Sequence, residues 1–153
     1  MSGYAGLDLQ TAVYNALVGD ATLQTALGAS GQDKKVYDTV PQNSQYPYVV
    51  IGDETALDWS TKSFNGGNTT MTMHVFTRGR GRAQCKAIIG HLHRILNLSN
   101  LSLTSNLLVL IRFEFTECFA EDMRHSNGTA QTEDLVTYHG VTRFRALTTQ
   151  TGV

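Results

Sequence analysis

The 153-residue sequence is poor in the residues that mark disordered, disulfide-linked or strongly charged proteins. It contains two prolines and two cysteines, and twelve Lys and Arg against thirteen Asp and Glu give a net charge of −1. So few prolines argue against a linker-like chain, and two cysteines do not make a disulfide framework. The balanced charge excludes the global electrostatic attraction that is typical of dedicated nucleic-acid binders and membrane-surface proteins.

Long hydrophobic runs are also missing. The longest is Leu107–Ile111, whereas a membrane-spanning helix needs about twenty apolar residues. The start of the chain has neither a basic patch nor an apolar stretch, so we expect no signal peptide and no membrane partner. We expect a protein that stays in the cytoplasm or in a particle assembled there. In that reducing compartment Cys85 and Cys118 are expected to be free thiols.

The composition that is present favours one folded domain over residues 1–153. Hydrophobic residues make up 41% of the chain, and the length fits the roughly 100–200 residues of a single domain. Charged residues make up only 16%, so much of the polar surface must come from Ser, Thr, Asn and Gln. Such a surface can meet another subunit without the cost of desolvating ions, which favours assembly.

Helical spacing of apolar residues appears in three segments. The first lies between residues 7 and 18, and Asp20 is expected to cap a second, short helix that Gly28 closes in the left-handed conformation. The strongest amphipathic pattern lies between residues 83 and 97. Its apolar stripe consists of Cys85, Ile88, Ile89, Leu92, Ile95 and Leu96.

Alternating residues predict strands at 36–37, 48–59, 69–77, 108–119 and 135–147. The expected turns are Asn65–Asn68 for one long hairpin and Ser126–Gly128 for the second. The polar loop Glu121–Glu133 is a candidate contact arm. Each of the three long strands 69–77, 108–119 and 135–147 is expected to bury one side. In that order, the residues expected to be buried are Met71, Met73 and Val75; Val109, Ile111, Phe113 and Phe115; and Tyr138, Thr142, Phe144 and Ala146. We therefore predict an α+β fold, with a mostly antiparallel sheet built from two long hairpins and covered by a central amphipathic helix and two short N-terminal helices.

The sequence contains no recognisable catalytic or metal-binding pattern. His91 and His93 point about 200° apart on a helix, so they cannot share one ion, and Cys85 belongs to the apolar stripe of a helix. We predict that the protein is not an enzyme and uses no cofactor or metal. His74 and His139 are each typical of a hydrogen-bonded sheet residue. The alternative is that these two histidines meet across strands together with Asp53 or Glu54.

Arg78-Gly79-Arg80-Gly81-Arg82, followed by Lys86, is the one dense basic cluster. It has three interpretations: a solvated turn, a contact with carboxylates of a neighbouring subunit such as Glu54 or Asp58, and a phosphate contact at a helix start. We rank the first two equally and the phosphate contact below them.

Trp59 and a group of charged strand residues are two further candidates for exposed surfaces. Trp59, near a hairpin tip, is either folded back as a lid or exposed as an interface anchor. The four residues Arg112, Glu114, Arg143 and Arg145 are predicted to share one sheet face as a ladder of charge pairs.

The order of these segments resembles the tail-completion, or tail-terminator, proteins of long-tailed, siphovirus-like bacteriophages and related phage-like particles. The resemblance covers nearly the whole chain and rests on several stretches in order. They are Leu9–Gly28, Val36–Asp38 with Val40-Pro41, Pro47–Gly52, Trp59–Lys62, His74–Arg78 running into Gly81–Ala83, and Tyr138–Arg145. The segment 120–132 is longer than in typical members.

The resemblance implies a structural virion protein at the head–tail junction, assembled in the host cytoplasm. It implies a homo-oligomeric ring, usually a hexamer, at the head-proximal end of the tail. Such a ring ends tail-tube polymerisation and joins the tail to the head connector. The implied partners are copies of itself, the major tail tube protein, the head–tail connector or stopper protein, and DNA that passes through without sequence specificity.

The hypothesis for the ring interface places Trp59, Lys62, Arg78, Arg80 and Arg82 against the neighbour's Glu54 and Asp58. Arg143, Arg145 and Lys86 are candidates to face DNA in the lumen. The alternative function is an oligomeric adaptor or a nucleic-acid-binding module that uses the basic cluster Arg78–Lys86.

Overall fold

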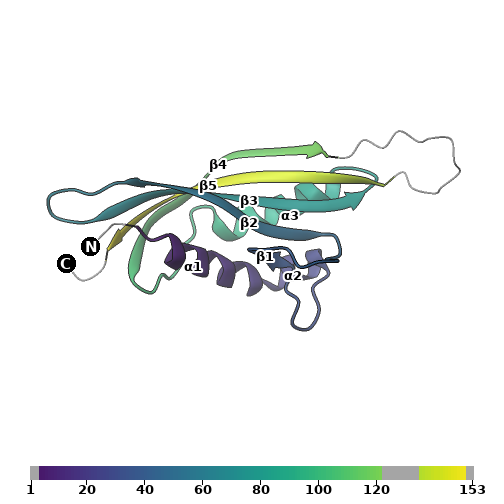
Figure 1. Ribbon diagram of the computed structural model, residues 1–153, viewed down its shortest axis with the longest axis horizontal. Helices are drawn as coiled ribbons and strands as arrows, with labels where there is room; N and C mark the ends of the chain where they lie inside the picture. Colours follow the sequence, from purple (N-terminus) through teal and green to yellow (C-terminus); the bar gives the residue numbers. More distant parts are fainter. Residues whose placement is uncertain (1–3, 122–134, 151–153) are drawn as a thin grey trace, which may run out of the picture.

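A computed structural model of the protein describes residues 4–121 and 135–150. Its helices are α1 (Gly6–Val18), α2 (Ala21–Leu27) and α3 (Ala83–Leu96), and its strands are β1 (Val36–Tyr37), β2 (Tyr48–Asp58), β3 (Gly66–Gly79), β4 (Asn106–Ala120) and β5 (Val136–Gln150). The strands form one sheet in the order β1-β2-β3-β5-β4 (Figure 1). Among these described strands only β1 and β2 run parallel. The predicted α+β class and mostly antiparallel sheet are confirmed.

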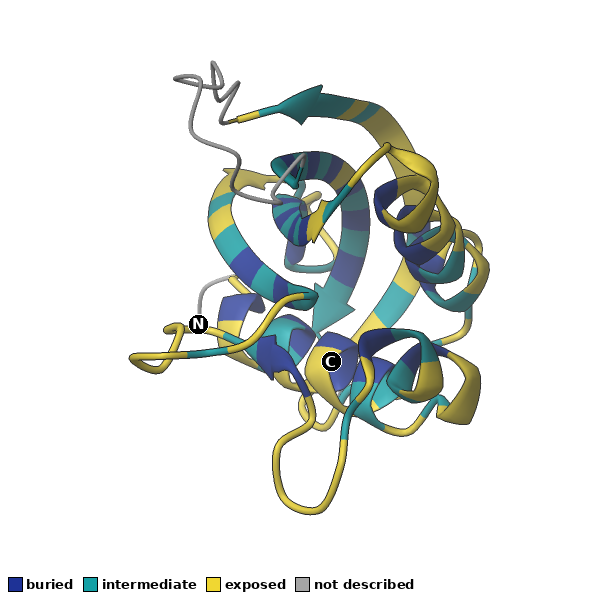
Figure 2. Ribbon diagram, turned by 90° about the vertical axis from the view of Figure 1, so that its right-hand side faces the viewer, coloured by how far each residue is buried: buried dark blue, intermediate teal, exposed yellow. Residues whose placement is uncertain are grey.

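The helices pack on one face of the sheet and bury the core there. Figure 2 shows their buried sides turned inward and their exposed sides outward. The predicted alternation in β3 and β5 is confirmed, because Met71, Met73, Val75, Tyr138, Thr142, Phe144 and Ala146 are all buried. None of the helices in residues 4–121 and 135–150 is long and apolar enough to cross a membrane.

Asp20 begins α2 and also ties it to α3. Its carboxylate accepts a hydrogen bond from the Leu23 backbone N–H at 2.8 Å and two more from the Arg94 guanidinium, at 2.8 and 3.0 Å. Chiefly because of the Arg94 hydrogen bond, the pKa of Asp20 falls to about 2. Gly28 ends the helix at φ 67°, so both predicted ends of the second helix are confirmed.

The turn of the β2–β3 hairpin is not at Asn65–Asn68, as predicted, because β3 already begins at Gly66. The connection runs through residues 59–65, and Gly66 packs closely against Trp59. A Cβ on Gly66 would come within 2.6 Å of the Trp59 backbone oxygen. The glycines that suggested a turn are therefore strand residues, and Gly66 is required by close packing.

The predicted face of Phe115 is wrong. β4 has register shifts between Leu108 and Leu110 and between Phe113 and Phe115. A bulge inserts one residue and moves the following side chains to the other face. Ile111 is buried as expected, whereas Phe115 pairs with Arg143 on the face that carries no helix, and Val109 is 53% exposed. The predicted Ser126–Gly128 turn and nearly all of the Glu121–Glu133 arm lie outside the described residues.

Candidate interaction surfaces

The basic cluster forms an exposed patch where β3 ends and α3 begins. Arg78, Arg80, Arg82 and Lys86 are exposed, and none of the ion pairs within residues 4–121 and 135–150 includes them. Arg82 lies over the Tyr138 ring, 5.3 Å from its centroid. The first turn of α3 contains no acidic residue, so these cations meet the positive end of the helix dipole, which is unfavourable.

Of the acidic residues of the hypothesis, Asp58 lies at the opposite end of the same hairpin, and Glu54 lies nearer the middle, in register with Met71. Asp58 is paired in register with Gly67, at the start of β3, and Arg78 stands near its end. At about 3.3 Å per residue these two ends of β3 are roughly 36 Å apart. Figure 1 shows the hairpin extending beyond the helices on the side away from the α3 start. The two charged groups therefore cannot neutralise each other within one chain.

Trp59 and Lys62 lie with the acidic group and not with the arginines. Trp59 is half-buried and packs edge-on against Phe64, with the ring centroids 5.7 Å apart. It is thus folded back within its own hairpin. Asp58 accepts a hydrogen bond from Ser60 at 2.6 Å, and Glu54 accepts one from Tyr4. The proposed interface residues therefore form two separate patches rather than one.

The sheet face without helices, here called the open face, carries the predicted charge ladder. Glu114 pairs with Arg145 and, at 3.3 Å, with Arg143. Arg143 also lies 5.6 Å from the centroid of the Phe115 ring. Arg112 is the cross-strand neighbour of Arg145, so the shared face is confirmed. Lys86 belongs to the helix layer on the other side of the sheet, and it cannot line one surface with these arginines.

The open face also brings His74 and His139 together. The Nδ1 atom of His74 lies 2.7 Å from the Nε2 atom of His139. Phe76 stacks on His139 with centroids 4.3 Å apart, and Phe119 lies beside it. Burial lowers the pKa of both histidines, and the neighbouring His74 lowers that of His139 further. The two histidines meet, as the alternative interpretation allowed.

Asp53 and Glu54, the acids proposed to join the two histidines, do not contact them directly. Glu54 bonds Tyr4 instead, and Asp53 raises the pKa of His74 only through its charge. The carboxylate beside the pair is Glu121, 3.9 Å from His139 Nδ1. Among the described residues no group of three or more His, Cys, Asp or Glu is arranged to hold a metal ion.

The sequence interpretation missed the role of His93. Its Nε2 atom lies 3.0 Å from Thr142 Oγ1 and 3.1 Å from Thr116 Oγ1, and the two hydroxyl oxygens are 3.0 Å apart. The ring lies against Phe113 in a tilted arrangement, with the centroids 4.4 Å apart. Burial lowers the pKa of His93. This polar triangle joins α3 to β4 and β5, and its position at the edge of the apolar stripe was the only signal for it.

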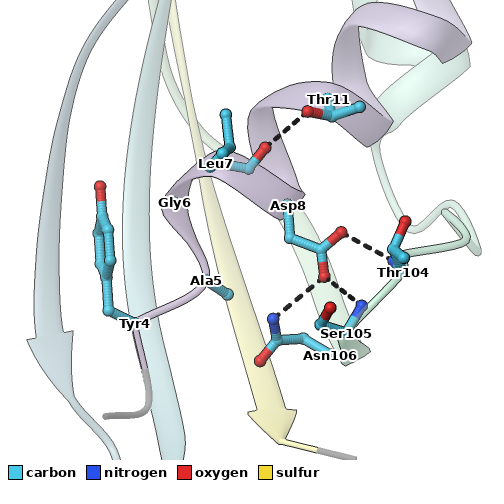
Figure 3. A pocket seen from close by; sticks show the side chains of 9 residues that line it. All are labelled: Tyr4, Ala5, Gly6, Leu7, Asp8, Thr11, Thr104, Ser105 and Asn106. Atoms are coloured by element: carbon cyan, nitrogen blue, oxygen red, sulfur yellow. Dashed lines mark hydrogen bonds between the residues drawn. The ribbon is translucent and has the colours of Figure 1, made fainter.

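A cleft of about 390 Å³ opens at the start of α1, next to the segment before β4 (Figure 3). Asp8 lies within it and accepts hydrogen bonds from the Thr104 and Ser105 backbone N–H groups at 2.7 and 2.8 Å, and from Asn106 Nδ2 at 3.0 Å. Burial raises the pKa of Asp8, but these hydrogen bonds outweigh it and leave the pKa below its ordinary value. Asp8 thus serves to fasten α1 to the sheet.

Comparison with known proteins identifies the family of this chain. The sequence pattern of the family described as Tail completion protein gp17 matches residues 11–149. The chain belongs to this family of tail completion proteins. It is 41% identical over 54 residues to the tail completion protein gp17 of Bacillus phage SPP1, a match that spans 35% of this chain and 40% of the length of that relative.

A solved structure supports the same family. A chain in the virion of a native gene transfer agent particle matches with a TM-score of 0.73 and 27% identity, covering 92% of this chain and 94% of that one. Tail completion proteins are structural components of the virion. The family and this match support a tail structural role in a phage or phage-like particle.

Proposed function

We propose that this tail completion protein is the subunit of a hexameric ring that closes the head-proximal end of the tail. One face of the ring ends polymerisation of the tail tube, and the other accepts the head–tail connector. The single observation that carries the proposal is the family match over residues 11–149. Residues 1–153 act as one domain in this arrangement.

The separation of charge supports contacts between unlike ends of neighbouring copies. The basic patch lies at one end of β3 and Asp58 lies at the other, so like ends of two copies repel and unlike ends attract. Contacts between unlike ends of successive copies are heterologous, and they close into a ring when the rotation between copies fits. We place Arg78, Arg80 and Arg82 of one copy against Asp58 and Glu54 of the next, with Trp59 and Lys62 beside those acids.

A charge exchange tests this interface. Arg80→Glu combined with Arg82→Glu should convert rings to monomers in native mass spectrometry and electron microscopy, and so should Asp58→Arg. An equimolar mixture of the two variants should form rings in which the variants alternate, because each supplies the charge that the other lacks. Arg143→Ala, on the open face, is the matched control and should leave the rings intact. Rings of unchanged mass in the first variant would refute the interface.

The second candidate function is a nucleic-acid-binding module or adaptor. The observation that favours it is the exposed basic patch at the start of α3, because helix N-termini bind phosphates. A retarded DNA band at physiological salt that Arg80→Glu abolishes would support this function. Capping of purified tail tubes by the protein would support the ring.

A further inference from the structure

The two cysteines of the chain lie on the helix-covered face, one on α3 and one on β4. Cys118 is the direct cross-strand partner of Gly140. A Cβ on Gly140 would lie 2.9 Å from the Cys85 Sγ atom and 2.6 Å from Ile89 Cδ1. The Cys85 sulfur therefore occupies the space that a side chain at position 140 would fill. Side chains opposite one another in an antiparallel pair have Cβ atoms about 4.5–5.5 Å apart, so this sulfur is within reach of the Cys118 side chain.

This neighbourhood suits a disulfide bond, which joins Cβ atoms about 3.8 Å apart. Cys85 is fully buried, whereas Cys118 is half-buried. Burial, together with the hydrogen bond and the charge of Cys118, raises the pKa of Cys85 to about 12. Of the two thiols, Cys118 is thus the one that an oxidant reaches.

We propose that Cys85 and Cys118 are a covalent modification site: a low-molecular-weight disulfide oxidises them to an intramolecular disulfide bond that fastens α3 to β4. The Cys118 thiolate attacks one sulfur of the oxidant, forms a mixed disulfide and releases one thiolate. Cys85 then loses its proton to solvent, attacks the Cys118 sulfur and releases the second thiolate. The two cysteines are oxidised by two electrons, and the oxidant is reduced to two thiols.

The high pKa of Cys85 makes the second step slow, because only the thiolate is nucleophilic. The biological setting rests on the proposed function in a virion. Thiols stay reduced in a cytoplasm and become oxidised outside it. A particle that leaves its host would therefore gain a cross-link in this subunit after assembly.

The test uses the full chain, incubated with excess glutathione disulfide and then analysed by intact-mass and peptide mass spectrometry. We expect a mass loss of about 2 Da, the two hydrogens that the exchange removes, and a peptide that links Cys85 to Cys118. The oxidised protein should melt about 5 °C or more above the reduced protein, and dithiothreitol should reverse this shift. Cys118→Ser should show neither the mass loss nor the shift.

A second variant, Cys85→Ser, tests the same proposal in case Cys118→Ser disturbs the packing of the core. Cys85→Ser should stop after the first step, with glutathione retained on Cys118. A wild-type protein that retains glutathione on Cys118, that keeps both thiols free, or that cross-links only between chains would overturn the proposal. Ring formation is scored separately by native mass spectrometry, so a cross-linked protein that forms no rings would refute the ring and leave the disulfide bond standing.

Discussion

At the scale of single residues, Asp20 combines two tasks that the sequence indicated only in part. The Gly19-Asp20 pair predicted the helix cap, since the pattern is local. The bidentate Arg94 contact joins residues 74 positions apart, and no local pattern reports it. His74 and His139 show the same limit, because their contact depends on β3 lying beside β5, two strands that are not consecutive in the chain.

The first prediction concerns Asp20. Asp20→Ala should lower the free energy of unfolding by about 1–2 kcal/mol, because α2 loses its cap, and urea denaturation followed by circular dichroism measures it. Asp20→Asn keeps the capping oxygen and should lose only the weaker contribution of the exposed ion pair. Equal losses in the two variants would show that the cap itself contributes little.

The second prediction concerns pH. Burial holds the pKa of His74 and of His139 below the ordinary value of 6.5, so below that value the unfolded chain binds more protons than the folded one. Stability from these two residues is therefore complete above about pH 6.5 and falls as the pH drops through their folded pKa values. Asp53, Glu117 and Glu121 oppose this loss, since their charges raise the two pKa values.

Melting temperatures measured between pH 7.5 and 5 check this expectation. The wild type should lose melting temperature on acidification, and His74→Gln should lose less of it over the same range. His91→Gln, on α3 and outside the pair, is the control and should follow the wild type. An identical pH dependence in all three proteins would contradict the role of the pair.

At the scale of elements, patterns of period two and 3.6 predicted the helices and strands well, because one face of each element is buried. The failures come from single inserted residues. The bulge beside Glu114 moved Phe115 to the open face, and an extra residue in a strand leaves no mark in an alternation of apolar residues. Gly66 was misread for a related reason, since a glycine in a tight turn and a glycine under a tryptophan look alike in sequence.

The third prediction contrasts two glycines of the α3–sheet layer. Gly90 of α3 is exposed, and a Cβ added there would meet open space, so Gly90→Ala should stabilise the protein by about 0.5–1 kcal/mol. Gly140→Ala should destabilise it by about 1–3 kcal/mol, because its methyl group would press on Ile89 and Cys85. Guanidinium denaturation measures both changes.

A double variant identifies the cause of the second effect. Ile89→Val removes the Cδ1 atom that lies 2.6 Å from the added methyl group. Ile89→Val and Gly140→Ala together should therefore cost less than the sum of the single changes. Strict additivity would place the cost in the strand backbone rather than in this contact.

At the scale of the whole molecule, the charge distribution governs how strongly the proposed ring would bind DNA that passes through it. The net charge is −1, and Glu114 partly neutralises Arg143 and Arg145 on the open face. A passage for DNA requires weak, sequence-independent contact, and strong phosphate binding would hold the duplex in place. We therefore expect the open face to bind DNA weakly, because the Glu114 carboxylate competes with phosphate for Arg143 and Arg145.

The fourth prediction follows from this balance. For a short duplex, the logarithm of the wild-type binding constant should vary with the logarithm of salt concentration with a slope smaller in size than about 1, since each neutralised phosphate contributes about 0.9. Glu114→Gln frees two guanidinium groups and should steepen the slope by about 1–2, measured by fluorescence anisotropy. Arg80→Glu should change it little, because the basic patch would face a neighbouring subunit. A steep wild-type slope that Arg80→Glu removes would instead make the basic patch a phosphate-binding surface, and the nucleic-acid-binding module would then replace the ring as the favoured function.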